Sequence, residues 1–180
     1  ADMLVVEVPM PDGKTSHFQM VETPVMAPEL QAQFPEIRSY TGRSVEDVSA
    51  VLKMDITPWG FHGMITSANQ GTVFIDPMVH GNTDFYVVYF KKDYKKAATA
   101  TAAWACDVTS PEGALELKRG DVKPAPITPD FQGDTQRRRY RLALACTGEY
   151  AVAVAGPSPT VPLVLAAMVT SMNRVNGVYE

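Results

Sequence analysis

The first half of the sequence is a series of short β-prone runs separated by turn signals, and this pattern constrains the fold more than any other feature. Residues 4–22, LVVEVPMPDGKTSHFQMVE, hold two such runs on either side of PDG, whose residue types favour a tight turn. Residues 44–78 hold three more runs, separated by TPWG and SANQG. Residues 37–44 and 84–94 each add one extended run. The sequence therefore predicts a meander over residues 44–78 within an antiparallel β-rich unit, but it does not give the exact strand order.

Proline and aromatic residues refine this prediction. The stretch PVMAPELQAQFPEI, residues 24–37, predicts a short helical turn that Pro28 opens and that ends before Pro35, because proline cannot continue a helix. The last β-prone run carries alternating bulky side chains that we expect to form part of the sheet core: Phe85, Val87 and Tyr89 on one face, and Tyr86, Val88 and Phe90 on the other.

The sequence changes character after Tyr94. Residues 95–136 contain few bulky apolar side chains and several Pro and Gly residues, so we interpret them as a linker or a loosely structured end of the first domain. The next stretch, TQRRRYRLALACTGEYAVAV, residues 135–154, is expected to return to a strand. Four of its side chains would share one face of that strand: Tyr140, Leu142, Leu144 and Cys146.

The C-terminal stretch predicts an amphipathic helix. Thr160 can cap its N-terminus, Pro162 is tolerated in the first turn, and Gly177 is expected to end it. Its expected buried face consists of Leu165, Met168, Val169 and Met172.

These elements predict an α+β protein that is mainly β. Residues 1–94 would form an antiparallel β-rich domain, residues 95–136 a linker, and residues 137–180 one strand and one helix. Since one strand and one helix cannot bury a core alone, we interpret the last part as the start of a truncated second domain.

Composition and charge exclude some classes of partner. The chain of 180 residues has 46% hydrophobic and 20% charged residues, which is typical of a globular protein, and its formal net charge is -4. A net negative charge argues against binding to nucleic acid, since phosphate contacts need clustered Lys and Arg. No run of about 18 apolar residues occurs, so we expect no membrane partner.

A resemblance to a known family adds what these patterns do not contain. The stretches RRRYRLALACTGEYA and LVLAAMVTSMNRVNGVYE resemble the start of the catalytic domain of secreted bacterial reprolysin-like zinc metalloproteases of the metzincin type. The upstream stretches, such as MDITPWGFHGMI and YVVYFKKDY, resemble the propeptide that precedes such a domain. The resemblance implies a secreted zymogen whose propeptide keeps the zinc protease latent and assists its folding, with the catalytic domain of its own precursor as partner.

The chain itself is not expected to be an enzyme or to hold a cofactor. It contains only three histidines, His17, His62 and His80, and none forms the HExxH pair of zinc ligands, so the zinc would belong to the full-length protease. We expect these histidines to be surface residues or hydrogen-bonded core residues.

Cys106 carries a mechanistic hypothesis. Its stretch ACDVT is similar to the propeptide motif in which a cysteine thiolate occupies the open position on the catalytic zinc, so the resemblance implies an inhibitory metal ligand. An alternative is a disulfide between Cys106 and Cys146, which would close a loop of about 40 residues and stabilise the fold by roughly 3 to 4 kcal/mol. A plain buried thiol is a further alternative for Cys146.

The basic cluster QRRRYR contains the candidate processing residues Arg137, Arg138, Arg139 and Arg141. Cleavage there would release the propeptide, whereas the alternative is a solvated, basic strand end.

Two hypotheses therefore remain: a propeptide with the start of its catalytic domain, and an independent secreted β-rich binding or adhesion module. The first predicts that residues 137–180 pack poorly within one chain, or pair with a second copy as a homodimer. The second predicts that the apolar face of the C-terminal helix is buried in the same chain.

Overall fold

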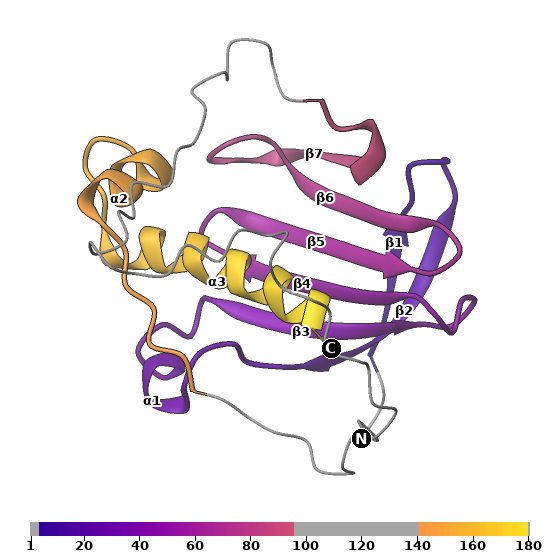
Figure 1. The fold of residues 1–180 in the computed structure, drawn as a ribbon, viewed down its shortest axis with the longest axis horizontal. Helices are drawn as coiled ribbons and strands as arrows, with labels where there is room; N and C mark the ends of the chain where they lie inside the picture. The colour runs from indigo at the N-terminus through magenta and orange to yellow at the C-terminus, as the bar shows by residue number, and fades with distance from the viewer. Residues whose placement is uncertain (1–3, 96–140, 180) are drawn as a thin grey trace, which may run out of the picture. The chain divides into compact units, whose positions relative to one another are not determined.

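The computed structural model describes residues 4–95 and 141–179. Seven strands form one antiparallel sheet in the order β1-β2-β3-β4-β5-β6-β7. Their bounds are β1 Leu4–Pro9, β2 Thr15–Glu22, β3 Arg38–Ser44, β4 Val51–Thr57, β5 Gly60–Ser67, β6 Gly71–Val79 and β7 Asn82–Phe90. Each strand pairs with its neighbour in sequence, which confirms the meander predicted for residues 44–78 and extends it to the whole sheet, and the sheet curls into a half-barrel (Figure 1).

The helical elements are α1 Pro28–Gln31, the short 3-10 helix η1 Lys91–Asp93, α2 Gly148–Ala155 and α3 Val161–Tyr179. The sequence correctly predicted α1, with Pro28 at its start. It also correctly predicted that the chain is a mainly β protein of the α+β class.

The predicted PDG turn joins β1 and β2. Gly13 has a φ of 80°, a conformation that glycine adopts without a steric penalty, and its amide donates to the Met10 carbonyl at 3.0 Å. The Asp12 carboxylate accepts a hydrogen bond from the Lys14 amide at 3.1 Å. Local sequence therefore determines the register of this hairpin.

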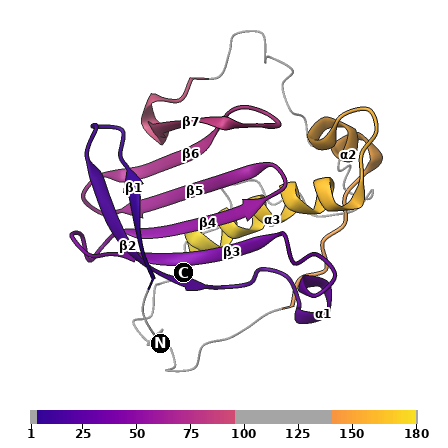
Figure 2. The same cartoon turned by 180° about the vertical axis from the view of Figure 1, so that it is seen from behind.

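The main core lies inside the curl of the sheet, where the β1-β2 hairpin crosses over the later strands (Figure 2). Its buried members are all apolar: Val8, Met10, Phe18, Met20, Ala50, Leu52, Met54, Ile65, Val73 and Ile75. Burial of these side chains is the principal source of stability of the sheet.

The prediction for β7 was wrong in part. Val88 and Phe90 pack against the main core, but Phe85 is 68% exposed and Tyr86 is 38% exposed. β7 is the last strand in the order of the sheet, and the side chains that pack against the main core, Val88 and Phe90, come from its C-terminal half.

Gly42 in β3 lies opposite Met20, and a Cβ at this position would collide with the Met20 sulfur and lie 3.1 Å from the Phe18 Cβ. We therefore expect Gly42→Ala to lower the free energy of unfolding by about 1–2 kcal/mol through overpacking. Chemical denaturation measures this change, and Gly148→Ala, where a Cβ would meet nothing within 4 Å, is the matched control. Equal stability of the two variants would contradict the expectation.

The strand predicted at residues 135–154 is wrong for residues 141–154, the part that the structure describes. Residues 141–147 have no regular secondary structure and residues 148–155 form α2. The physical reason is a capping signal: Thr147 accepts a hydrogen bond from the Tyr150 amide at 3.3 Å, and Glu149 lies in the first turn. Leu142 and Leu144, which the strand interpretation placed on a covered face, are exposed.

The predicted end of the C-terminal helix was also wrong, because α3 continues through Gly177 to Tyr179. Instead of ending the helix, Gly177 allows α3 to approach the sheet closely. A Cβ at this position would lie 2.6 Å from the Met64 Cε and 2.8 Å from the Lys53 Cγ. The glycine lets this end of α3 lie directly on the sheet.

Residues 4–95 and 146–179 belong to one compact unit, whereas residues 141–145 belong to a second unit whose other residues lie outside the described part of the chain. The assignment of residues 137–180 to a separate domain stays a prediction, because a segment can pack against a neighbouring domain as well as within its own.

Candidate functional site at the helix-sheet interface

Helix α3 lies across the middle of the sheet, on the face opposite the β1-β2 hairpin (Figures 1 and 2). The residues of α3 that are buried are Val164, Ala166, Val169, Thr170 and Asn173. Of the predicted apolar face, Val169 is buried, while Leu165, Met168 and Met172 are partly buried. The helix thus buries a different and more polar set of residues than its sequence predicted.

A small apolar cluster holds the N-terminal half of α3. Ala166 and Val169 pack with Met26 and Ile37, which come from the segment around α1. Ala166 is 0% exposed, so this helix comes very close to its neighbours. The cluster is separate from the main core inside the curl.

Three hydrogen bonds join α3 to β4 and to the turn after it. The Thr170 hydroxyl donates to Asp55 Oδ1 at 2.7 Å, and the Asn173 side-chain amide donates to the Met54 carbonyl at 2.9 Å. The Trp59 indole donates to the Leu163 carbonyl at 2.7 Å. Such directional contacts fix the rotation and the axial position of the helix on the sheet.

An ion pair joins the C-terminal half of α3 to β6. The Arg174 guanidinium binds Asp76 Oδ1 and lies 5.0 Å from the centre of the Phe74 ring. The Tyr89 hydroxyl donates to the other oxygen of Asp76 at 2.9 Å. Burial, together with the Asp76 carboxylate, raises the pKa of Tyr89 to about 12.

The interface also buries charged groups of the sheet. Asp55 is only 1% exposed and accepts the Thr170 hydroxyl, and the His62 ring lies beside it. Lys53 is buried as well, and its ammonium donates to the Thr41 hydroxyl at 2.9 Å. The interface beneath α3 is therefore much more polar than the wholly apolar main core.

Hydrogen bonding across this interface is incomplete. Among the described residues, two buried side-chain polar atoms make no hydrogen bond, His62 Nδ1 and Arg174 Nε, and both lie beneath or on α3. His62 Nδ1 is 3.2 Å from Asp55 Oδ1, close enough for electrostatic attraction, but the geometry is not that of a hydrogen bond. Each unsatisfied buried group lowers the net stability of the contact.

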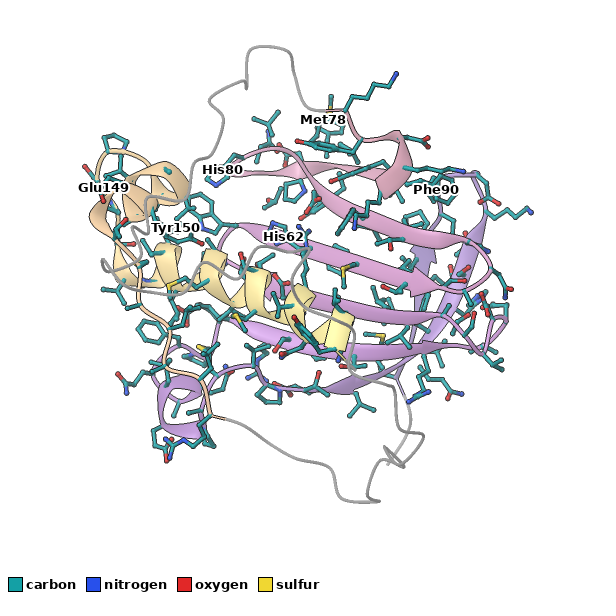
Figure 3. All side chains as sticks on the ribbon, in the orientation of Figure 1. His62, Met78, His80, Phe90, Glu149 and Tyr150 are labelled. Atoms are coloured by element: carbon teal, nitrogen blue, oxygen red, sulfur yellow. The ribbon has the colours of Figure 1, made fainter. Side chains whose placement is uncertain are left out.

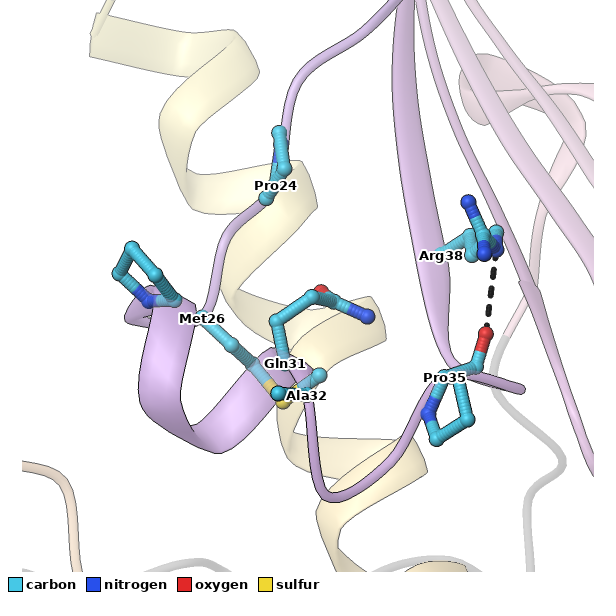
Figure 4. A pocket seen from close by; sticks show the side chains of 7 residues that line it. Pro24, Met26, Gln31, Ala32, Pro35 and Arg38 are labelled. Carbon is cyan, nitrogen blue, oxygen red and sulfur yellow. Dashed lines mark hydrogen bonds between the residues drawn. The ribbon is translucent and has the colours of Figure 1, made fainter.

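One cavity lies beside α1, and a second borders α3. The first, of about 380 Å³, lies beside α1, and its polar lining side chains are both bound within the protein: Gln31 donates to the Ile37 carbonyl and Arg38 to the Pro35 carbonyl (Figure 4). The second, of about 360 Å³, belongs to the interface itself and is bordered by α2, α3, the strand β5 that carries His62 and the β6-β7 turn that carries His80 (Figure 3).

Of the predicted functional residues, the structure describes Arg141 and Cys146. Arg141 and Cys146 are exposed, so the alternative of a buried thiol at Cys146 was wrong. Cys106 and Arg137, Arg138 and Arg139 lie outside the described residues. The zinc-ligand role of Cys106, its disulfide with Cys146, and processing at the arginine cluster therefore stay predictions.

The three histidines occupy different environments. His80 packs on Trp59 with ring centres 4.2 Å apart, and His62 lies beneath α3 beside Asp55. His17, in β2, contacts Glu46 through Nδ1 at 2.5 Å and lies 3.6 Å from Glu7. No group of three potential metal-binding side chains occurs within residues 4–95 and 141–179.

The His17-Glu46 contact predicts a pH dependence of stability. Glu46 raises the pKa of His17 above 6.5, so its contribution is complete below pH 6.5 and is lost as pH rises through the raised value. The amide and ring of His17 lower the pKa of Glu46 from 4.5 to about 2, so this contribution is complete above pH 4.5 and is lost as pH falls to about 2. The contact is therefore strongest between pH 4.5 and 6.5.

We expect His17→Gln to flatten this maximum in a plot of the denaturation midpoint against pH. The effect is small because both side chains are partly exposed to solvent. His80→Gln, which removes a histidine without a carboxylate contact among the described residues, is the control. A profile of His17→Gln that matches the wild type would contradict the expectation.

Comparisons with protein-family models, with curated proteins and with solved structures found no match. Within the described part of the chain, no helix has the length and apolar character that crossing a membrane requires. Function is therefore inferred from the helix-sheet interface and from the resemblance in sequence.

Proposed function

We propose that this chain contains the propeptide of a secreted, reprolysin-like zinc metalloprotease, followed by the first segment of the catalytic domain. In this proposal the sheet binds α3, the segment that resembles the first catalytic helix, and thereby keeps the protease latent and assists its folding. The observation that carries the proposal is the polar interface between α3 and the sheet, with its buried Asp55, Thr170 and Asn173.

The composition of this interface favours a contact that forms and later separates. Interfaces between domains that come apart are more polar than the core of a single domain. The buried Asp55, Thr170 and Asn173, and the two unsatisfied nitrogen atoms, fit such a contact better than they fit a permanent core. Because sheet and helix are parts of one chain, a high effective concentration maintains the contact at a modest intrinsic affinity.

Release would require cleavage of the segment that links them. Cutting at Arg137, Arg138, Arg139 or Arg141 would remove the covalent link and with it the effective concentration, so that α3 could leave the sheet. The proposal retains Cys106 as a candidate ligand to the zinc of the catalytic domain, where a thiolate would displace the water that attacks the peptide bond. No zinc ligand of the protease itself is proposed within this chain.

One observation favours the second function, an independent β-rich binding or adhesion module. Of the helix face that this hypothesis predicts to be buried in the same chain, Val169 is buried and Leu165, Met168 and Met172 are partly buried. The two functions differ in whether a zinc protease domain is encoded downstream of Glu180, and in the effect of weakening the interface.

The test uses the precursor that contains this chain and, by the proposal, a catalytic domain with an HExxH motif. Zinc-dependent hydrolysis of a general peptide substrate is measured before processing for the wild type, Asp55→Ala and Cys106→Ala. We expect Asp55→Ala to raise this activity several-fold, because it weakens the α3 contact, and Glu36→Ala, at an exposed position, to leave it unchanged. A rise in Cys106→Ala would support the thiolate role.

Two results would overturn the proposal. One is a precursor without an HExxH motif after residue 180, which would favour the binding module. The other is unprocessed activity as high as that of the mature protease in the wild type, which would show that the propeptide does not inhibit.

A further inference from the structure

The outer edge of β7 is the part of the sheet whose backbone has no strand partner within residues 4–95 and 141–179. β7 pairs with β6 through residues from Asn82 to Phe90, and no described strand lies beyond it in the sheet (Figure 1). Unpaired N-H and C=O groups along a strand of this length are a template for pairing with another strand. The opposite edge, β1, is shorter and carries Glu7 and Pro9.

The sequence of β7 lacks the features that protect natural sheet edges. Residues 85–90, FYVVYF, contain no proline and no charged side chain. The register shift of the β6-β7 ladder lies between Asn82 and Tyr86, and residues 86–90 pair regularly with β6. Phe85 is 68% exposed, and Met78 in the neighbouring β6 is 66% exposed. An exposed apolar edge of this kind marks an interaction site in a folded protein.

The charges around β7 are suited to pairing with a second copy of the same strand. The charges at the two ends are opposite: Asp84 precedes the stretch, and Lys91 and Lys92 come after it, all three exposed. An antiparallel arrangement brings the acidic end of one copy to the basic end of the other, twice by symmetry.

We propose that β7 pairs antiparallel with β7 of a second copy of this chain, so that two sheets join into one continuous sheet across a two-fold axis. With Val88 opposite its own symmetry mate, Tyr86 lies opposite Phe90 of the second copy, and Asp84 lies near the start of its η1, which contains Lys91 and Lys92. Aromatic pairs and opposite charges in directly opposed positions both stabilise antiparallel pairing. This interface differs from the homodimer through residues 137–180 that the sequence predicted.

Sedimentation equilibrium of the full 180-residue chain, from micromolar to submillimolar concentration, tests the proposal. We expect a monomer-dimer equilibrium in the wild type. Asp84→Lys places like charges opposite each other at both ends and should raise the dimer Kd about tenfold, since the change acts twice. Combining Asp84→Lys with Lys91→Asp and Lys92→Asp should restore the wild-type Kd.

Glu36→Lys is the matched control, because it changes the net charge by the same amount at an exposed position away from β7. Circular dichroism of each variant verifies that the fold is retained, and Lys92→Asp alone provides a second variant that should also weaken the dimer. A chain that remains monomeric at every concentration, or a Kd for Asp84→Lys equal to that of Glu36→Lys, would overturn the proposal.

Discussion

Replacing Asp55 with alanine is expected to loosen α3 from the sheet and to lower the free energy of unfolding by about 2–3 kcal/mol. The carboxylate is 1% exposed and accepts the Thr170 hydroxyl at 2.7 Å, so its removal leaves that donor without a partner in the interior of the interface. It also removes the negative charge beside His62. Because Asp55 points away from the main core, the β1-β2 hairpin should be little affected.

Amide hydrogen exchange separates these two effects. In Asp55→Ala, exchange should become faster along α3 and remain near the wild-type rate in β1 and β2. Asp55→Asn is the matched control, since it keeps the shape and one oxygen that can accept from Thr170, and it should cost less. If alanine and asparagine gave the same stability as the wild type, the hydrogen bond would not contribute to holding the helix.

Local chemistry made the sheet predictable from the sequence. PDG, TPWG and SANQG are turn signals whose residue types favour tight turns, and in a meander each turn also identifies the next strand partner. Short-range turn chemistry was therefore sufficient to predict the meander of residues 44–78, whereas the order of all seven strands came from the structure.

The C-terminal region was less predictable because two signals compete there. The alternation Leu142, Leu144 and Cys146 indicates a strand, whereas Thr147 followed by Glu149 is typical of a helix start. In the structure the cap determines the outcome, and the alternating residues form no strand. The prediction of a strand gave weight to periodicity and missed the cap.

The polar contacts of α3 could not be found from an apolar stripe. Bulky residues at helical spacing pointed to Met168 and Met172, which are only partly buried. Thr170, Asn173 and Gly177 have a related spacing, and they lie against the sheet because their partners, Asp55 and the Met54 carbonyl, come from a strand far away in sequence. In the sequence, the signal for this contact face was the spacing of small and polar residues along the helix.

Phe18→Ala is expected to have the largest effect of any single substitution considered, a loss of about 3–5 kcal/mol in the free energy of unfolding. The ring is 1% exposed and belongs to the main core, where the β1-β2 hairpin packs against the later strands. The lost burial and the cavity left behind both contribute. This loss is comparable with the total stability of many small domains.

In Phe18→Ala, the loss of stability in the main core should also destabilise α3. Since α3 depends on β4 and β5 for its contacts, faster exchange in the sheet of Phe18→Ala should be accompanied by faster exchange in α3. The reverse is not expected in Asp55→Ala, where the helix loosens and the sheet persists. Val48→Ala, at a position that is 93% exposed, is the control and should change stability by less than about 0.5 kcal/mol.

The two substitutions together determine whether α3 is an integral part of the fold or a segment that the sheet holds reversibly. If helix and sheet exchange together in both variants, they form one cooperative unit, as an independent binding module requires. If α3 alone is released in Asp55→Ala, the sheet is stable without it. A propeptide that releases the first helix of its protease after cleavage needs this second property.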